Sequence, residues 1–189
     1  HRQMREKERD MDLILASGSP RRRELLSLYT TDFTVCVSDF DESTVTADTP
    51  AHLVEQLARG KCLAVAKDHP GAVVLGCDTV VDVGGEVFGK PHSVEDARRM
   101  LRALSGAVHE VHTGVCISDG TRTESFVDTF FPIPEGEIDA YTATKEPYDK
   151  AGAYAIQGRA ALWLDRLEGD YYTIMGLPVS RTARLLNRF

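Results

Sequence analysis

A short apolar run near the middle of the chain constrains the fold more than any other feature. Residues 72–77, AVVLGC, have the length of one strand, and their unbroken apolar character suits a central strand covered on both faces. The pairs Gly84-Gly85 and Asp119-Gly120 each separate two strand-like segments, as hairpin turns do. Because further strands alternate with helical segments, we expect an α/β fold whose mixed sheet is flanked by helices.

Local signals place the individual elements. The dipeptides at 19–20 (SP) and 49–50 (TP) combine a capping residue with a proline at the first helical position, which predicts a helix start. The segment SVED at 93–96 resembles a capping box. The expected strands are 12–16, 33–38, 72–77, 79–83, 86–88, 109–118, 121–131 and 161–167, and the expected helices are 20–29, a helix from 50, 93–104, 135–144 and 178–188.

The charge and hydropathy of the chain limit its partners. A formal net charge of −7 argues against a general nucleic-acid-binding protein, which needs a basic excess to neutralise phosphates. No apolar run approaches the roughly 20 residues of a membrane-spanning helix, so we expect no membrane partner. Residues 1–10 are polar and show no secretory signal pattern. We expect residues 1–11 to be a flexible extension and residues 12–189 to form one domain.

The cysteines and histidines do not have the sequence spacing of a known metal-binding motif. The four cysteines form no Cys-x-x-Cys pair, and three lie in apolar runs, so we expect a reduced, cytoplasmic setting. The segment HEVH at 109–112 differs from the zinc-protease motif, because one residue instead of two separates Glu110 from His112. In a strand, His109 and His112 would also point to opposite faces.

The segment SGSPRRR at 17–23 joins the first expected strand to the first expected helix. A small-residue turn before a helix N-terminus suits an anion, because free backbone N–H groups and the helix dipole favour negative charge. Three arginines there oppose the dipole by roughly 0.3–1 kcal/mol each unless an anion compensates them. Guanidinium groups match phosphate oxygens well. The segment is therefore a candidate phosphate site, and a solvated charged face is the open alternative.

Five further polar residues are candidates for chemistry. Asp78 directly follows the apolar strand, near its expected exit, and more strand follows it, so a turn does not explain it. A carboxylate there suits a divalent metal or the activation of water, and Glu42 is a second carboxylate on a loop. Lys61 and Lys90 add cations that suit phosphates. Gln157 lies in a small, apolar segment, either as a buried amide or as a ligand contact.

Taken together, these segments resemble the Maf family of nucleoside triphosphate pyrophosphatases. The resemblance covers the chain from Leu13 to about Leu186, in order. The matching segments are LASGSPRRRELL, DES, ARGKCLAVA, GCDTVV, GEVFGKP, ARRMLRALSG, HEVHTGVCI, EPYDKAGAYAIQG and RLEGDYYTIMGLPV. The segment YDKAGAYAIQG is similar to the subgroup that acts on dTTP and UTP. Cys77 stands where alanine is usual, and Arg23 adds a third arginine to the usual pair.

The resemblance implies an activity, a fold and a set of site residues. The implied reaction is hydrolysis between the α- and β-phosphates, which gives a nucleoside monophosphate and pyrophosphate with Mg²⁺ or Mn²⁺ as cofactor. The implied fold is elongated, has two lobes with a central cleft and is related to the inosine-triphosphate pyrophosphatases; a homodimer is an open expectation. The implied roles are catalysis for Asp78, Lys61 and Gln157, substrate binding for Ser17, Arg21, Arg22 and Lys90, and metal binding for Asp78 and Glu42.

Two other functions stay open at this point. One is a nucleotide-binding regulator linked to cell division that scarcely hydrolyses its ligand. The other is the same chemistry on another base, such as that of 7-methyl-GTP or ITP, whereas CTP and modified pyrimidine nucleotides belong with dTTP and UTP in the main hypothesis. For the main hypothesis, we expect Asp78 to polarise the water that attacks the α-phosphorus, while the arginines and lysines hold the phosphates.

Overall fold

The computed structural model describes residues 11–104, 109–134, 164–168 and 171–189. Its strands are β1 Leu13–Leu15, β2 Thr34–Val35, β3 Val73–Val83, β4 Glu86–Phe88, β5 Glu110–Ser118, β6 Thr123–Pro134 and β7 Leu164–Glu168. Its helices are α1 Pro20–Leu26, the 3₁₀ turn η1 Glu42–Thr44, α2 Pro50–Ala66, α3 Val94–Leu104, α5 Tyr171–Met175 and α6 Val179–Leu186.

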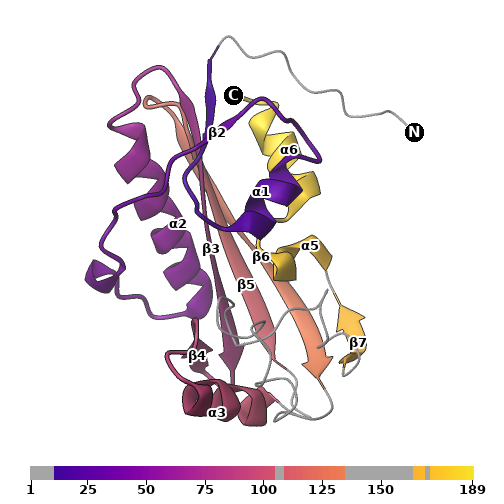
Figure 1. Cartoon of the computed structure of the whole chain (residues 1–189). Coiled ribbons are helices and arrows are strands. Elements are labelled where there is room, and N and C mark those ends of the chain that lie inside the picture. Colours follow the sequence, from indigo (N-terminus) through magenta and orange to yellow (C-terminus); the bar gives the residue numbers. More distant parts are fainter. Residues whose placement is uncertain (1–10, 105–108, 135–163, 169–170) are drawn as a thin grey trace.

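The strands form one mixed sheet in an elongated molecule (Figure 1). The order is β2-β1-β3-β5-β6-β7, and β4 pairs with the far end of β3. β1 pairs in parallel with β2 and β3, whereas the pairs made by β4, β5, β6 and β7 are antiparallel. The predicted mixed α/β fold is confirmed.

The predicted helix starts are also confirmed. The Ser19 hydroxyl accepts a hydrogen bond from the backbone N–H of Arg22, and Pro20 is the first residue of α1. Thr49 caps α2 in the same way by accepting from His52 N–H at 3.1 Å. These caps satisfy donors that a helix start would otherwise leave unpaired.

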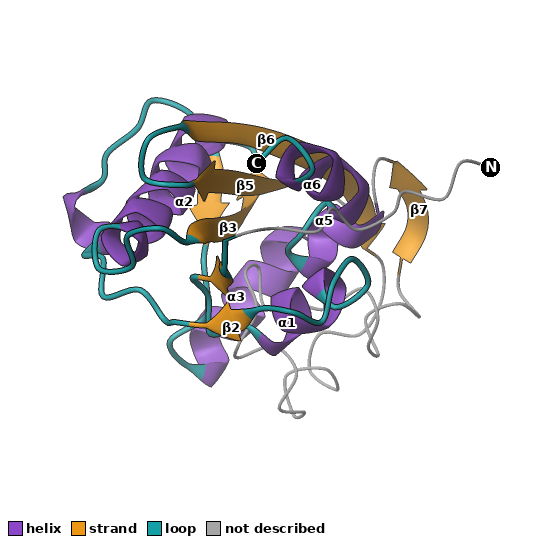
Figure 2. Ribbon diagram, turned by 90° about the horizontal axis from the view of Figure 1, so that it is seen from above, coloured by secondary structure: helices purple, strands orange, loops and turns teal. Residues whose placement is uncertain are grey.

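Helices cover both faces of the sheet. Figure 2 shows α2 on one side of the strands and α1, α5 and α6 on the other. The crossover β1-α1-β2 and the crossover β2-α2-β3 run in opposite directions across the sheet, so right-handed connections place α1 and α2 on opposite faces. Alternate β3 residues fill the two cores: Val73, Leu75 and Cys77 pack in the α1–α6 core, and Val74 packs against α2.

The structure corrects several element boundaries. The two strands expected at 72–77 and 79–83 are one continuous strand, β3, so Asp78 lies mid-strand and the prediction that it is near the strand exit was wrong. The pairing of β3 with β5 stabilises this continuity, because it extends from Val74 to Asp82. α1 ends at Leu26, earlier than expected, and α5 was not predicted. The expected helix at 135–144 lies outside the described residues.

Within the described part of the chain, no helix combines the length and the apolar character that a membrane span requires.

Candidate active site

The site lies where β1 ends beside β3. β1 pairs with β3 only as far as Leu75, which accepts a hydrogen bond from Ala16 N–H at 2.8 Å. β4 begins to pair with the same edge of β3 at Val81. Between these points, residues 76–80 of β3 face a gap in the sheet pairing made by the described residues. The carboxyl end of a parallel strand between oppositely placed helices is where α/β proteins generally bind ligands, and Asp78 lies in this gap.

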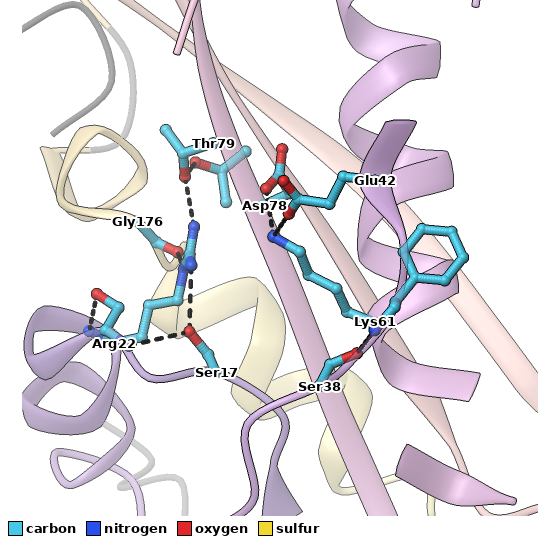
Figure 3. Close-up of polar contacts among 11 residues, drawn as sticks. Ser17, Arg22, Ser38, Glu42, Lys61, Asp78, Thr79 and Gly176 are labelled. Atoms are coloured by element: carbon cyan, nitrogen blue, oxygen red, sulfur yellow. Dashed lines mark hydrogen bonds and ion pairs between the residues drawn. The ribbon is translucent and has the colours of Figure 1, made fainter. Parts of the chain in front are cut away.

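Two carboxylates converge on one ammonium group in the gap (Figure 3). Lys61 Nζ lies 2.7 Å from Asp78 Oδ1 and 2.6 Å from Glu42 Oε1. The side chains of Asp78 and Lys61 are only 13% and 18% exposed, whereas that of Glu42 is 55% exposed. The residues come from β3, α2 and the 3₁₀ turn η1, so three separate elements build this cluster.

Small residues allow these elements to approach closely. A Cβ atom at Gly76, on the α2 face of β3, would lie 2.6 Å from the carbonyl oxygen of Ala58 in α2. The glycine therefore lets α2 lie close enough to the strand for Lys61 to reach Asp78. Gly60, in α2, leaves the space that the Phe40 ring occupies. Packing of Phe40 on α2 holds the loop that carries Glu42.

The charges in this cluster perturb one another. Burial disfavours the charged form of Lys61, but attraction to Asp78 and hydrogen bonds to Asp78 and Glu42 outweigh burial and raise the pKa of Lys61. Burial raises the pKa of Asp78, and the nearby Lys61 and Arg22 cations only partly oppose this rise. A carboxylate whose pKa is raised is a stronger base when ionised, as a proton acceptor near neutral pH requires.

Arg22 forms a second polar cluster on the opposite face of β3. Its Nε donates to Gly176 O at 2.9 Å, Nη1 to Ser17 Oγ at 3.2 Å and Nη2 to Thr79 Oγ1 at 3.0 Å (Figure 3). The guanidinium thus joins the β1–α1 loop, β3 and the end of α5. These hydrogen bonds fix its position, and contacts among the described residues use three of its five N–H groups.

The three arginines of α1 therefore differ. Arg21 lines the same cleft as Arg22, whereas Arg23 is exposed and lies in the last turn of the helix, where a cation is favourable. The solvated-face alternative holds for Arg23 alone. Lys90 lines the cleft from the wall formed by the β4–α3 segment. Gln157 lies outside the described residues.

A single cleft of about 1080 Å³ contains all of the described candidate residues. Its walls come from the β1–α1 loop, α2 and η1 on one side and from β4, α3 and α5 on the other. This is the central cleft that the resemblance implied, and its volume suits a nucleotide-sized ligand. The seven candidates that line it are Ser17, Arg21, Arg22, Glu42, Lys61, Asp78 and Lys90.

The threonine hydroxyl groups that help to hold Arg22 in place were not predicted from the sequence. Thr79 Oγ1 and Thr113 Oγ1 are 2.9 Å apart on adjacent strands, and Thr113 donates to Thr173 O of α5 at 2.8 Å. Thr79 and Thr113 are a directly opposite pair in the β3–β5 register. A threonine in a strand is ordinary by composition, so only the register and the position of α5 reveal this network.

Asp78 and Glu42 fit a divalent cation. Their oxygens already converge on the single positive charge of Lys61, and carboxylate oxygens are the ligands that Mg²⁺ and Mn²⁺ prefer. The donor set therefore suits the metal that the sequence predicted.

The family of the chain follows from its sequence as a whole. The model of the family described as Maf-like protein matches residues 12–189. The chain belongs to this family.

Similar proteins extend over almost the same residues. A Bacillus cytotoxicus protein named dTTP/UTP pyrophosphatase is 46% identical over 180 residues, which cover 93% of this chain and 94% of the relative. A Bacillus mycoides protein of the same name is 45% identical over 181 residues, which cover 94% and 95%. The structure of the Staphylococcus aureus Ham1 protein has a similar fold, with a TM-score of 0.58, 16% identity and coverage of 94% and 98%. This last likeness supports the fold alone.

Proposed function

We propose that this Maf-like protein hydrolyses dTTP and UTP to the nucleoside monophosphate and pyrophosphate. The observation that carries the proposal is the convergence of Asp78, Lys61 and Glu42 in one cleft with Arg22. A carboxylate with a raised pKa beside several cations suits phosphoryl chemistry, in which catalysis is mainly positioning and electrostatic stabilisation. The names of the relatives supply the two bases.

In this mechanism Asp78 is the general base. A water oxygen bonds to the α-phosphorus, the bond from that phosphorus to the oxygen bridging the β-phosphorus breaks, and pyrophosphate leaves with the bond electrons. Asp78 accepts the proton that the water loses. Lys61 orients the Asp78 carboxylate through their 2.7 Å hydrogen bond, while Arg21, Arg22 and Lys90 neutralise the phosphates.

Asp78 and Glu42 would hold the divalent cation, Mg²⁺ or Mn²⁺. When bound, it neutralises phosphate charge and favours deprotonation of the attacking water. Ser17, whose hydroxyl accepts from Arg22 at 3.2 Å, serves the substrate mainly by keeping that guanidinium in place. The role of Gln157 in catalysis belongs to the same proposal and rests on the family resemblance.

The proposal includes the wider setting of the enzyme. Residues 12–189 act as one domain, matching the extent of the family model, after a short extension at 1–11. The partner is a small nucleotide, and neither nucleic acid nor membrane is needed. A cytoplasmic location agrees with four free cysteines, three of them buried. We also propose a homodimer, in which each chain would line its own cleft with its own residues.

A substrate panel tests the activity. Purified full-length protein is given dTTP, UTP, CTP, 7-methyl-GTP and ITP with Mg²⁺ or Mn²⁺, and pyrophosphate and orthophosphate are measured separately. We expect pyrophosphate from dTTP and UTP. Orthophosphate instead would contradict the bond assignment, a preference for 7-methyl-GTP or ITP would contradict the base assignment, and binding without product would favour the regulator.

Water labelled with heavy oxygen tests the point of attack. Attack at the α-phosphorus puts the label in the nucleoside monophosphate, whereas attack at the β-phosphorus puts it in pyrophosphate. Asp78→Asn should abolish most turnover while leaving nucleotide binding measurable, because the amide keeps the size of the carboxylate and cannot accept the proton. Full turnover by Asp78→Asn would refute the role of Asp78 as the base.

A further inference from the structure

Three potential metal ligands lie together outside the cleft, on β3 and β5. They are Asp82, Glu110 and His112, whose ligand atoms all lie within 4.8 Å of one another. Asp82 and Glu110 are directly opposite each other in the β3–β5 register, and Glu110 and His112 are two residues apart on one strand. All three side chains therefore leave the same face of the sheet. None of them lines the cleft that contains Asp78.

The two carboxylates are placed unfavourably unless a cation lies between them. Like charges directly opposite each other on neighbouring strands destabilise a sheet. Asp82 Oδ1 accepts a hydrogen bond from Gly85 N–H at 3.0 Å, which leaves the second oxygen of Asp82 for another partner. Among the ion pairs that the described residues form, none joins a lysine or an arginine to Asp82 or Glu110.

His112 provides the independent sign of a ligand. Its side chain is only 7% exposed, and among the described residues its Nε2 has no hydrogen-bond partner. That atom nevertheless lies 2.9 Å from Glu110 Oε2, at the centre of the cluster. A buried polar atom without a hydrogen bond is costly and calls for an explanation.

The other ring nitrogen is arranged as in metal-binding histidines. His112 Nδ1 is 2.9 Å from Thr129 Oγ1, on the adjacent strand β6. With the ring proton on Nδ1, the ring donates to that hydroxyl, and the lone pair of Nε2 is directed toward the carboxylates. Metal-binding histidines almost always donate their second N–H in this way, which fixes the tautomer and the ring orientation.

We propose that Asp82, Glu110 and His112 form a second metal site, which takes a divalent transition metal of the Zn²⁺ type. One imidazole and two carboxylates suit Zn²⁺ better than Mg²⁺, since Mg²⁺ prefers oxygen ligands alone. The site joins β3 to β5 next to the β3–β4 hairpin, beyond which Lys90 forms a wall of the cleft. Bound metal would therefore stabilise the hairpin end of the sheet.

The HEVH segment alone does not predict this site. Its spacing excludes a zinc-protease motif, and His109 and His112 fall on opposite faces of a strand, so the proposed site does not use His109. The third ligand, Asp82, is contributed by another strand, 28 residues before Glu110 in the sequence, through the antiparallel register of β3 and β5.

Metal titration tests the proposal without relying on turnover. The full-length Asp78→Asn variant, freed of metal with a chelator, removes one ligand of the cleft site and leaves the proposed site intact. Zn²⁺ binding is measured by calorimetry, and Co²⁺ is used as a probe whose visible absorption reports nitrogen and oxygen ligands. We expect one tight equivalent, and a loss of affinity of at least about tenfold when Glu110→Gln or His112→Gln is added.

The control is His52→Gln, which removes an exposed histidine whose Nδ1 lies 2.6 Å from Asp48. It should leave Zn²⁺ affinity and the Co²⁺ spectrum unchanged. If His112→Gln does not fold, Glu110→Gln alone decides, because Glu110 is partly exposed. Unchanged affinity in Glu110→Gln, or no tight equivalent in the starting protein, would overturn the proposal and leave the contact between His112 and Glu110 a purely structural one. Because no readout is hydrolysis, failure here is distinguishable from failure of the proposed function.

Discussion

Replacing Gly76 with alanine should separate Lys61 from Asp78, which we propose to act together in catalysis, without replacing either residue. The new Cβ would lie 2.6 Å from Ala58 O and 2.8 Å from Cys62 N and Cβ, all in α2. Ordinary contact begins at 3.4 Å, so α2 must move away from β3 by about 0.8 Å. Lys61 precedes Cys62 in this helix, and the same movement would lengthen its 2.7 Å contact with Asp78.

The magnitudes follow from this shift. Overpacking of a close interface typically costs about 1–3 kcal/mol of the free energy of unfolding. A misplacement approaching 1 Å in a catalytic group can lower turnover by about 100-fold, so we expect kcat to fall about 10- to 100-fold. Urea denaturation measures the free energy of unfolding, and the rate of pyrophosphate release from dTTP measures kcat.

Gly71→Ala is the matched control. Gly71 has a φ of +83°, and no atom lies within 4 Å of the position that a Cβ would occupy there, so alanine strains the backbone but displaces no neighbour. The left-handed conformation should cost about 1–2 kcal/mol of stability and leave kcat unchanged. If Gly76→Ala lost stability but kept kcat within about twofold of the Gly71→Ala value, close packing of α2 would not be what aligns Lys61 with Asp78.

Three further predictions concern charge and packing. In pH profiles of kcat/KM, activity should fall at acidic pH as Asp78 becomes protonated. Lys61→Gln removes a cation that lowers the pKa of Asp78, so the acidic limb of the profile should move to higher pH. Glu42→Gln removes a carboxylate that raises the pKa of Asp78, so the acidic limb should move to lower pH. Limbs that move together would contradict this assignment. Arg22→Lys should weaken dTTP binding in calorimetry, because a lysine cannot reproduce the three hydrogen bonds that the Arg22 guanidinium makes to separate elements. Unchanged affinity for dTTP would exclude a role of this guanidinium in substrate binding. Cys77 is fully buried, so Cys77→Ala should lower the free energy of unfolding, measured by urea denaturation, by about 1 kcal/mol. Burial also raises the pKa of the Cys77 thiol to about 11, so the thiol is not a nucleophile and turnover should not change. A loss of turnover would indicate a catalytic thiol.

Local chemistry allowed the sequence to predict much of the fold. Ser19-Pro20 and Thr49-Pro50 mark helix starts because a capping hydroxyl and a preset φ act within one turn of chain. The Gly84-Gly85 hairpin is predictable because both residues adopt positive φ, at 58° and 88°. The short helix α5 had no such cap signal, and the break expected at Asp78 was wrong because pairing with β5 carries β3 through it.

The sequence by itself determined which residue types the site contains: a carboxylate directly after an apolar run, a run of arginines after a small-residue turn, and two lysines. Only the tertiary structure decided which of these residues meet. Strand alternation directs Asp78 to the α2 face and Thr79 to the α1 face, and the close approach of α2 at Gly76 brings Lys61 to Asp78. Such contacts depend on register and on distances between elements, which arise only when the chain packs, and that is why Arg22 lines the cleft while Arg23 faces solvent.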